Sequence, residues 1–151
     1  MNLRQAANYG NVLCMGKVVV KIKVTSLKDS ILKAAGARKA NPRSARVDAL
    51  VDTGATRLYL KTSVIRALGL AKVDSVASQT TNGPTLRAVY EPVRLEVQGR
   101  HGDFNVVDVG EDVPNLVGQI PLEYLDFVVD PKNQKLIPNP AHGDKQMSEE
   151  Y

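Results

Sequence analysis

One short segment of the chain, residues 49–55, has the residue types that acid–base chemistry needs. It reads Ala-Leu-Val-Asp-Thr-Gly-Ala and places a single carboxylic acid, Asp52, directly after an apolar run. Because a buried acid is costly unless it is hydrogen-bonded or paired, an acid at this place is a candidate for catalysis. An ordinary turn is the competing interpretation, since Asp accepts backbone hydrogen bonds in turns and Gly adopts positive φ there. Taken alone, the segment favours the ordinary turn.

Other catalytic and binding motifs are absent from the sequence. It contains no glycine-rich phosphate loop and no Gly-x-Ser-x-Gly segment. The two histidines, His101 and His142, lack the partner at i+4 that a helical zinc site requires. The single cysteine, Cys14, lies in a segment without pattern, where a catalytic thiol is not expected. We therefore expect no metal ion and no cofactor.

Three segments in chain order resemble the retropepsin-like aspartic peptidases, the family of the retroviral proteases and their cellular and bacterial relatives. Residues 50–55 match the family's hydrophobic-hydrophobic-Asp-Thr-Gly-Ala segment. The residues that stand where the family has the tip of its β-hairpin flap are Thr81, Asn82, Gly83 and Pro84. The residues that match the later hydrophobic-hydrophobic-Gly, which opens a short helix, are Leu116, Val117 and Gly118. The resemblance covers residues 17–139, and residues 122–138 are similar to the C-terminal part of bacterial members.

The resemblance implies an aspartic endopeptidase with a polypeptide substrate. Asp52 would be the catalytic acid or base, and the Thr53 hydroxyl would bond across a dimer axis. Gly54 would let the loop turn and approach the substrate, and Ala55 would line the floor of the site. Residues 116–118 would pack beneath this loop as support. The hairpin at 81–84 would close over an extended peptide that binds as an added β-strand.

The number of candidate acids predicts a homodimer. Aspartic peptidases use two carboxylates that share one proton, because two like charges about 3 Å apart cannot both be ionised. The 151 residues contain one Asp-Thr-Gly and no Asp-Ser-Gly, so the second carboxylate would be Asp52 of another copy on a two-fold axis. A catalytically inactive peptide-binding or assembly module on the same fold is the alternative, and a strictly monomeric chain would favour it.

Three residues, at two places in the chain, depart from the family pattern. Thr56 and Arg57 follow the Asp-Thr-Gly-Ala segment where many viral members carry an acid. Gln119 follows Gly118 where Arg is common and often serves dimer contacts. We therefore expect the dimer contacts to be arranged differently. If the Arg57 side chain points inward, its charge would lower the apparent pKa of the catalytic pair.

The pattern along the chain predicts a mostly-β fold, a small closed barrel of the retropepsin-like kind with one or two short helices. Alternating apolar residues predict strands at 18–24, 46–51, 93–97 and 104–109, and Asn82-Gly83 predicts a hairpin between 75–81 and 85–90. Two more strands are predicted at 127–129 and 135–137, with a turn at 99–102. Helices are predicted at 62–69, with Thr62 as N-cap and Gly69 as the stop, and at 120–124.

The basic segment 26–46 contains one acid, Asp29, and is predicted to be a solvated insertion with a short helix at 31–35. A docking site for an acidic partner is the alternative. Nucleic-acid binding through this segment is disfavoured, because aromatic residues are only 5% of the chain and there is no Trp.

Composition limits the remaining possibilities. With 43% hydrophobic and 24% charged residues, the chain can build a core, and a net charge of +4 fits an ordinary solvated surface. We expect a peptidase domain at 15–139, a disordered or non-native arm at 1–14 and a flexible tail at 140–151. A single cysteine excludes an internal disulfide and favours the cytoplasm, and we expect no secretory leader and no membrane contact.

Overall fold

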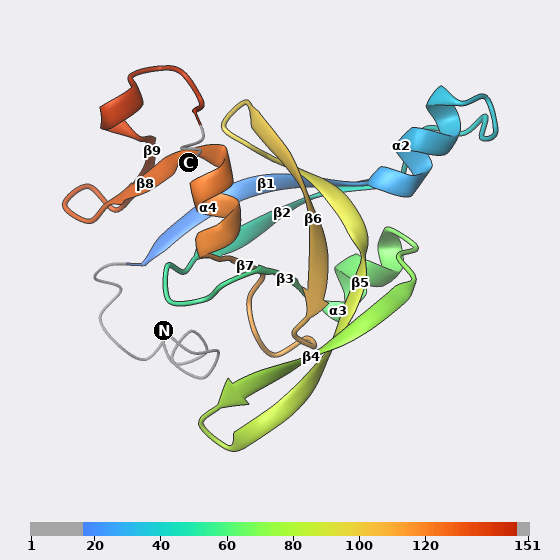
Figure 1. Cartoon of the computed structure of the whole chain (residues 1–151), viewed down its shortest axis with the longest axis horizontal. Coiled ribbons are helices and arrows are strands. Elements are labelled where there is room, and N and C mark those ends of the chain that lie inside the picture. The colour runs from blue at the N-terminus through green and yellow to red at the C-terminus, as the bar shows by residue number, and fades with distance from the viewer. Residues whose placement is uncertain (1–16, 148–151) are drawn as a thin grey trace.

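The computed structural model describes residues 17–147. The expected arm at 1–14, Cys14 and the end of the expected tail lie outside the described residues. The elements in chain order are β1 (Val18–Ser26), α2 (Leu27–Ala34), β2 (Ser44–Val51), β3 (Leu58–Leu60), α3 (Thr62–Ala67), β4 (Lys72–Thr80), β5 (Gly83–Val97), β6 (Arg100–Asp108), β7 (Leu116–Val117), α4 (Gln119–Leu125), β8 (Phe127–Asp130), β9 (Lys135–Pro138) and the 3-10 turn η1 (Pro140–His142) (Figure 1). None of the helices in this part of the chain has the length and apolar character needed to cross a membrane.

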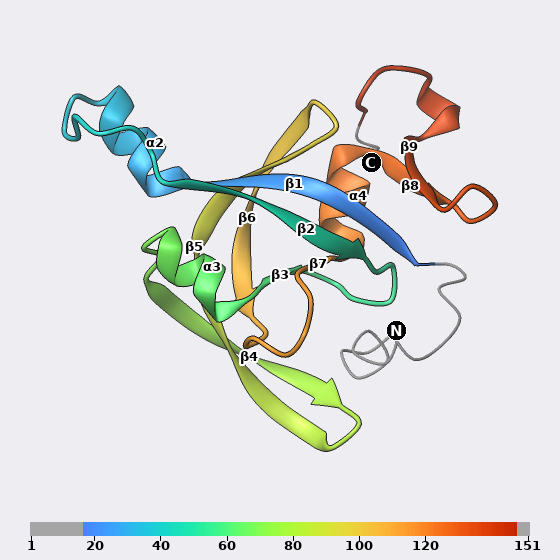
Figure 2. The same cartoon turned by 180° about the vertical axis from the view of Figure 1, so that it is seen from behind.

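Six strands form a ring, which confirms the predicted small, mostly-β fold. They follow one another in the order β1-β2-β7-β3-β6-β5, and β1 also pairs with β5, which closes the ring. The short strand β7 pairs in parallel with β2, and β3 pairs in parallel with β6. β4 pairs with β5 and forms the first arm of a hairpin that projects from the ring (Figures 1 and 2). The ring therefore brings the end of β2 next to a segment about 65 residues later in the chain.

The hydrophobic core lies inside the ring and is built from side chains of several strands. In β1 the predicted alternation is confirmed, because Val18, Val20, Ile22 and Val24 are buried between exposed or half-exposed neighbours. They pack with fully buried residues of the other strands, such as Leu95. Each such side chain contributes about 1.5–3 kcal/mol to the free energy of folding.

The helices differ from their predicted ends for local reasons. α2 begins at Leu27, earlier than predicted, because the Ser26 side chain accepts a hydrogen bond from the Asp29 N–H and caps it. The prediction that Thr62 is the N-cap of α3 is wrong. Thr62 is the first helical residue, and its hydroxyl donates a 2.7 Å hydrogen bond to Asp108 Oδ1. The helix ends at Ala67, and Gly69 follows with a φ of +63°.

Two further predictions need correction. The predicted turn at 99–102 is wrong, because the turn lies at Gln98 and Gly99, which both adopt positive φ. β6 therefore begins at Arg100, and its first residues pair with the end of β5. Residues 17–147 also contain three short α-helices, where the prediction was one or two.

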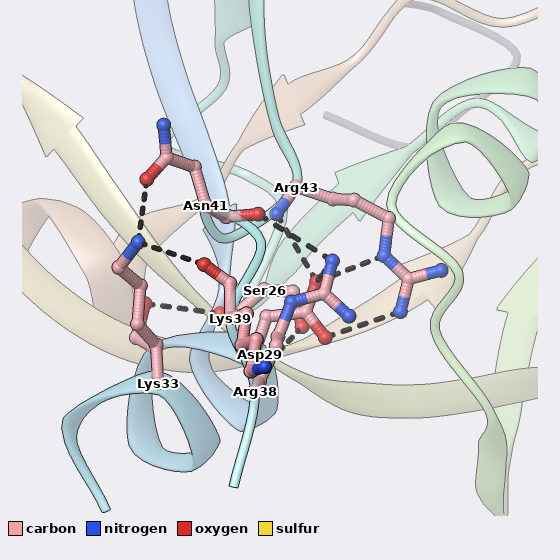
Figure 3. A network of polar contacts seen from close by, with 8 residues as sticks. Ser26, Asp29, Lys33, Arg38, Lys39, Asn41 and Arg43 are labelled. Atoms are coloured by element: carbon pink, nitrogen blue, oxygen red, sulfur yellow. Dashed lines mark hydrogen bonds and ion pairs between the residues drawn. The ribbon is translucent and has the colours of Figure 1, made fainter. Parts of the chain in front are cut away.

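The basic segment forms α2 and a loop, and its one acid holds the segment together. Asp29 is buried and accepts hydrogen bonds from Arg43 Nε at 2.8 Å and Arg43 Nη2 at 3.1 Å (Figure 3). Arg38 Nη2 lies 3.5 Å from the same carboxylate. Hydrogen bonding from Arg43 outweighs burial and lowers the pKa of Asp29 to about 2. Two of the basic side chains, Arg38 and Arg43, thus form ion pairs with Asp29 of the same segment.

Candidate active site

Asp52 lies directly after β2, at the mouth of the ring. Only 2% of its surface is exposed. The Asp52 N–H donates a 3.0 Å hydrogen bond to Val117 O, and the Gly54 N–H donates a 2.9 Å hydrogen bond to Asp52 Oδ1. Burial raises the pKa of the Asp52 carboxyl above its ordinary value, and hydrogen bonds from the Gly54 and Ala55 backbones oppose that shift. A carboxyl in this position can hold a proton more readily than an exposed one can.

The loop at 52–57 is joined to the start of α4. The Gly118 N–H donates to Arg57 O at 2.8 Å, the Gln119 N–H to Ala55 O at 2.8 Å, and the Ile120 N–H to Thr56 O at 3.0 Å. The first N–H groups of a helix have no partner within the helix, so the loop carbonyls satisfy them here. The loop that carries Asp52 therefore shares its backbone hydrogen bonds with α4.

The structure brings together two of the predicted segments. Leu116 and Val117 form β7, are buried, and pair with Leu50 and Val51 of β2. Gly118 is buried against the loop, because a Cβ placed on it would lie 2.5 Å from Arg57 O and 2.7 Å from Ala55 O. Residues 116–118 thus contact both the end of β2 and the loop that carries Asp52.

A cleft of about 450 Å³ opens beside the loop, between it and the β4–β5 hairpin. Its lining residues are Gly54, Ala55, Thr56, Arg57, Tyr59, Val76, Ala77, Ser78, Gln79, Arg87 and Val107. Thr53 and Gly54 are exposed to solvent, and Ala55 is half-buried. The loop and the hairpin thus form two sides of the cleft, and Asp52 itself is not among the lining residues.

The predicted flap residues form the tip of this hairpin and do not line the cleft. Thr80 pairs with Gly83, so Thr81 and Asn82 are the turn, and Pro84 begins the second arm opposite Gln79. The tip projects beyond the body of the molecule (Figures 1 and 2). Within one chain, the cleft is lined instead by residues 76–79 and Arg87 of the two arms.

The side chain at position 119 stays on its own helix. Gln119 Nε2 donates a 2.8 Å hydrogen bond to Glu123 Oε1, one turn further along α4. Arg57, which also departs from the family pattern, is one of the residues that line the cleft, and it lines a second, smaller cavity with Asp103 as well.

Sequence reasoning missed two residues that build the site, Asn115 and Arg87. Asn115 is buried, accepts from the Lys61 N–H at 2.8 Å and donates to Asp48 O at 3.0 Å. It therefore ties β7 to β2 and to the end of β3. The position of Asn115 after Pro114 is typical of a turn and does not indicate this role. In the sequence, Arg87 is one polar residue in an alternating strand and nothing marks it as part of a site.

The histidines take no part in this site. His101 is exposed on β6, and His142 Nδ1 lies 2.7 Å from Asp126 Oδ2 in a different part of the molecule. In residues 17–147, no three His, Cys, Asp or Glu side chains are grouped so that they could hold a metal ion.

Comparison with known families gives a match over the part of the chain that contains Asp52. A family model described as aspartyl protease matches residues 39–119, just over half of the chain. The match begins before β2, includes the loop of Asp52 and the hairpin, and ends at the first residue of α4. No curated protein matches the sequence.

Proposed function

Because this chain belongs to the aspartyl protease family, we propose that it is an aspartic endopeptidase that acts as a homodimer. Each copy would supply one Asp52 carboxylate to a shared site. The observation that carries the proposal is the buried Asp52 at the end of β2, with the Gly54 N–H on its Oδ1 and a cleft beside its loop.

The chemistry needs two carboxyl groups in different protonation states. One Asp52 is ionised and takes a proton from a water molecule. As it does so, the water oxygen attacks the carbonyl carbon of the peptide. The other, protonated, donates a hydrogen bond to the carbonyl oxygen and stabilises the negative charge that develops there. Collapse of the tetrahedral intermediate breaks the C–N bond, and the amine leaves with a proton from the pair. The raised pKa of Asp52 supports a shared proton in such a pair.

The surface above Asp52 supports assembly from two copies. Thr53 and Gly54 are exposed in one chain although Asp52 beneath them is buried. A second copy that meets the first at this loop would cover the exposed residues and bring the two carboxylates together. The dimer would be symmetric, because the same loop contributes from both sides.

The cleft and the hairpin support an extended peptide as the substrate. The cleft runs between the loop at 54–57 and residues 76–79 of β4, next to the hairpin turn. A peptide in this cleft could pair with strand backbone while alternate side chains enter pockets. The projecting tip at Thr81 and Asn82 would fold over the peptide when the second copy and the substrate are present.

The proposal is tested by peptide cleavage with matched variants. We expect the purified protein to cleave members of a diverse peptide pool between mildly acidic and neutral pH, and Asp52→Asn to abolish cleavage. Asp48→Asn is the control, because Asp48 is an exposed acid on the same strand. Mass spectrometry of the products would give the cleavage sites, and sedimentation would give the mass in solution.

Mixing experiments separate a shared site from two independent sites. If each site needs two Asp52 carboxylates, an equal mixture of wild type and Asp52→Asn should retain about a quarter of the activity, since mixed dimers are inactive. Independent sites would retain half. A dimer that cleaves nothing would contradict the peptidase and favour the inactive peptide-binding module.

A further inference from the structure

The charged groups that line the cleft all have one sign. Of the eleven lining residues, Arg57 and Arg87 carry a positive charge and none is Asp, Glu or Lys. They come from opposite sides, Arg57 from the loop of Asp52 and Arg87 from strand β5 of the hairpin. A ligand that lies between the loop and the hairpin would therefore have a cationic residue on each side.

One nitrogen of the Arg87 side chain, Nε, is buried and has no hydrogen-bond acceptor among residues 17–147. Arg87 lies opposite Val76 in the hairpin, so its strand neighbour offers no side-chain acceptor. A buried N–H without an acceptor is costly, and an incoming carboxylate would remove that cost.

Several other arginines in the described chain have carboxylate or carbonyl partners, although Arg38 Nε, like Arg87 Nε, has no acceptor of its own. Arg43 and Arg38 contact Asp29, Arg94 forms a two-pronged contact with Asp103, and Arg100 donates to the carbonyl oxygens of residues 125 and 126. In contrast, neither Arg57 nor Arg87 has a carboxylate within 4.0 Å among residues 17–147. The cleft thus holds two cationic groups that are free to bind an anion.

We propose that the cleft selects peptides with an acidic side chain, Asp or Glu, close to the scissile bond. Arg57 and Arg87 would be the residues that determine this specificity. The planar guanidinium group binds a carboxylate through two parallel N–H donors, which the amide of Gln or Asn cannot match. The inference rests on the proposed peptide-binding role of the cleft and adds the class of side chain that it accepts.

The test uses fluorescent octapeptides made in pairs that differ only by Glu or Gln at one position. Binding is measured by anisotropy with the full Asp52→Asn chain, so the result does not depend on cleavage. We expect the Glu peptides of at least one position to bind about tenfold more tightly than their Gln partners at low salt. The ratio should fall to about two or less in Asp52→Asn with Arg87→Met, and should fall at high salt because screening weakens charge pairing.

A control variant separates a local contact from net charge. Arg66→Met removes the same charge from an exposed position on α3 that does not line the cleft. The Glu-to-Gln ratio should stay near tenfold in this variant. Circular dichroism and the mass in solution of each variant would show that fold and assembly are retained.

The two proposals fail in different ways. Equal binding of Glu and Gln peptides at every position would overturn the acidic preference, whether or not the wild type cleaves peptides. If the wild type cleaved no peptide but Glu peptides still bound more tightly than Gln peptides, the peptidase proposal would be overturned and the acidic preference would stand. If Arg87→Met changed the mass in solution and left the Glu-to-Gln ratio intact, Arg87 would serve assembly and its role in specificity would be refuted.

Discussion

The backbone of Gly118 lies directly against the backbone of Arg57. The Gly118 N–H donates a 2.8 Å hydrogen bond to Arg57 O, and a Cβ placed on Gly118 would lie 2.5 Å from that oxygen. The loop that carries Asp52 and the first turn of α4 are therefore in backbone contact, with no side chain between them. This contact explains why the residue that opens α4 must be Gly.

Gly118→Ala should destabilise the protein by about 2–4 kcal/mol, because the added methyl group would push the loop away from α4. Peptide cleavage should fall more than stability alone explains, since Asp52 moves with the loop. Chemical denaturation would measure the loss of stability. Cleavage rates under conditions in which both proteins are fully folded would measure the loss of activity.

Gly102→Ala is the control for that change. Its Cβ would meet the ring of Tyr124, whose side chain is half-exposed and can move aside. We expect a loss of at most about 1 kcal/mol. Equal losses in the two variants would contradict the requirement for close backbone contact at residue 118.

Asn115→Ala should cost about 2–4 kcal/mol of folding free energy. The Asn115 side chain is buried and makes two hydrogen bonds, one from the Lys61 N–H and one to Asp48 O. Its removal leaves both backbone groups without a partner. Asn105→Ala is the matched control, since Asn105 also donates to a backbone carbonyl but is exposed, and it should cost under about 1 kcal/mol. Similar losses, measured by urea denaturation, would refute the bridging role.

The sequence contained enough to predict most of the strands and the hairpin, because each depends on a local pattern, whereas β3 and β7 were not predicted and the choice of Asp52 as the candidate acid needed the resemblance. Val18 to Val24 alternate along one strand, and Asp52 follows an apolar run directly. The link between Asp52 and Gly118 came from resemblance, and backbone hydrogen bonds now give it a physical cause. Local pattern sufficed where a residue's environment is set by its neighbours in the chain.

Contacts between distant residues could not be predicted in this way. Thr62 looked like a helix cap, but its hydroxyl donates to Asp108, 46 residues away. Arg87 faces the cleft because β5 is paired with β4 in one register, and β5 alone does not show it. Asp29 was the single acid in a basic segment, and the sequence did not reveal that Arg43 binds it.

Asp29 should make stability depend on pH in the acid range. Its pKa is about 2 in the folded chain, and its ordinary value is 3.8. A lowered pKa in the folded state stabilises the fold above about pH 4, and this contribution is lost as the pH falls from about 4 to 2. Asp29→Asn should therefore cost about 1–2 kcal/mol at pH 7 and less at pH 2. Denaturation of both proteins over this range would measure the difference.

Asp103→Asn provides the comparison for this pH effect. Asp103 also accepts two hydrogen bonds from an arginine, Arg94, but its side chain is 38% exposed. An exposed pair of this kind contributes little, so we expect a change within about 0.5 kcal/mol at any pH. If the unfolding free energies of Asp29→Asn and Asp103→Asn changed with pH in the same way, the pH dependence assigned to the buried Asp29–Arg43 pair would be contradicted.

Asp126 should hold the C-terminal segment, residues 139–147, against α4. Its carboxylate accepts from Asn139 Nδ2 at 3.1 Å and the Met147 N–H at 3.0 Å, and lies 2.7 Å from His142 Nδ1. Burial raises the pKa of Asp126, but these hydrogen bonds outweigh burial and hold the pKa below its ordinary value. The charged form is therefore the one that binds the segment.

Asp126→Asn removes the charge and keeps the backbone, because Asn tolerates the left-handed conformation that residue 126 adopts. Trypsin should then cleave after Lys145 about tenfold faster, since weaker contacts let the segment open more often. Asp130→Asn is the control, because Asp130 accepts hydrogen bonds from residues 132 and 133 within its own turn. Mass spectrometry of timed digests would follow the cut, and equal rates in wild type and Asp126→Asn would show that the carboxylate does not hold the segment.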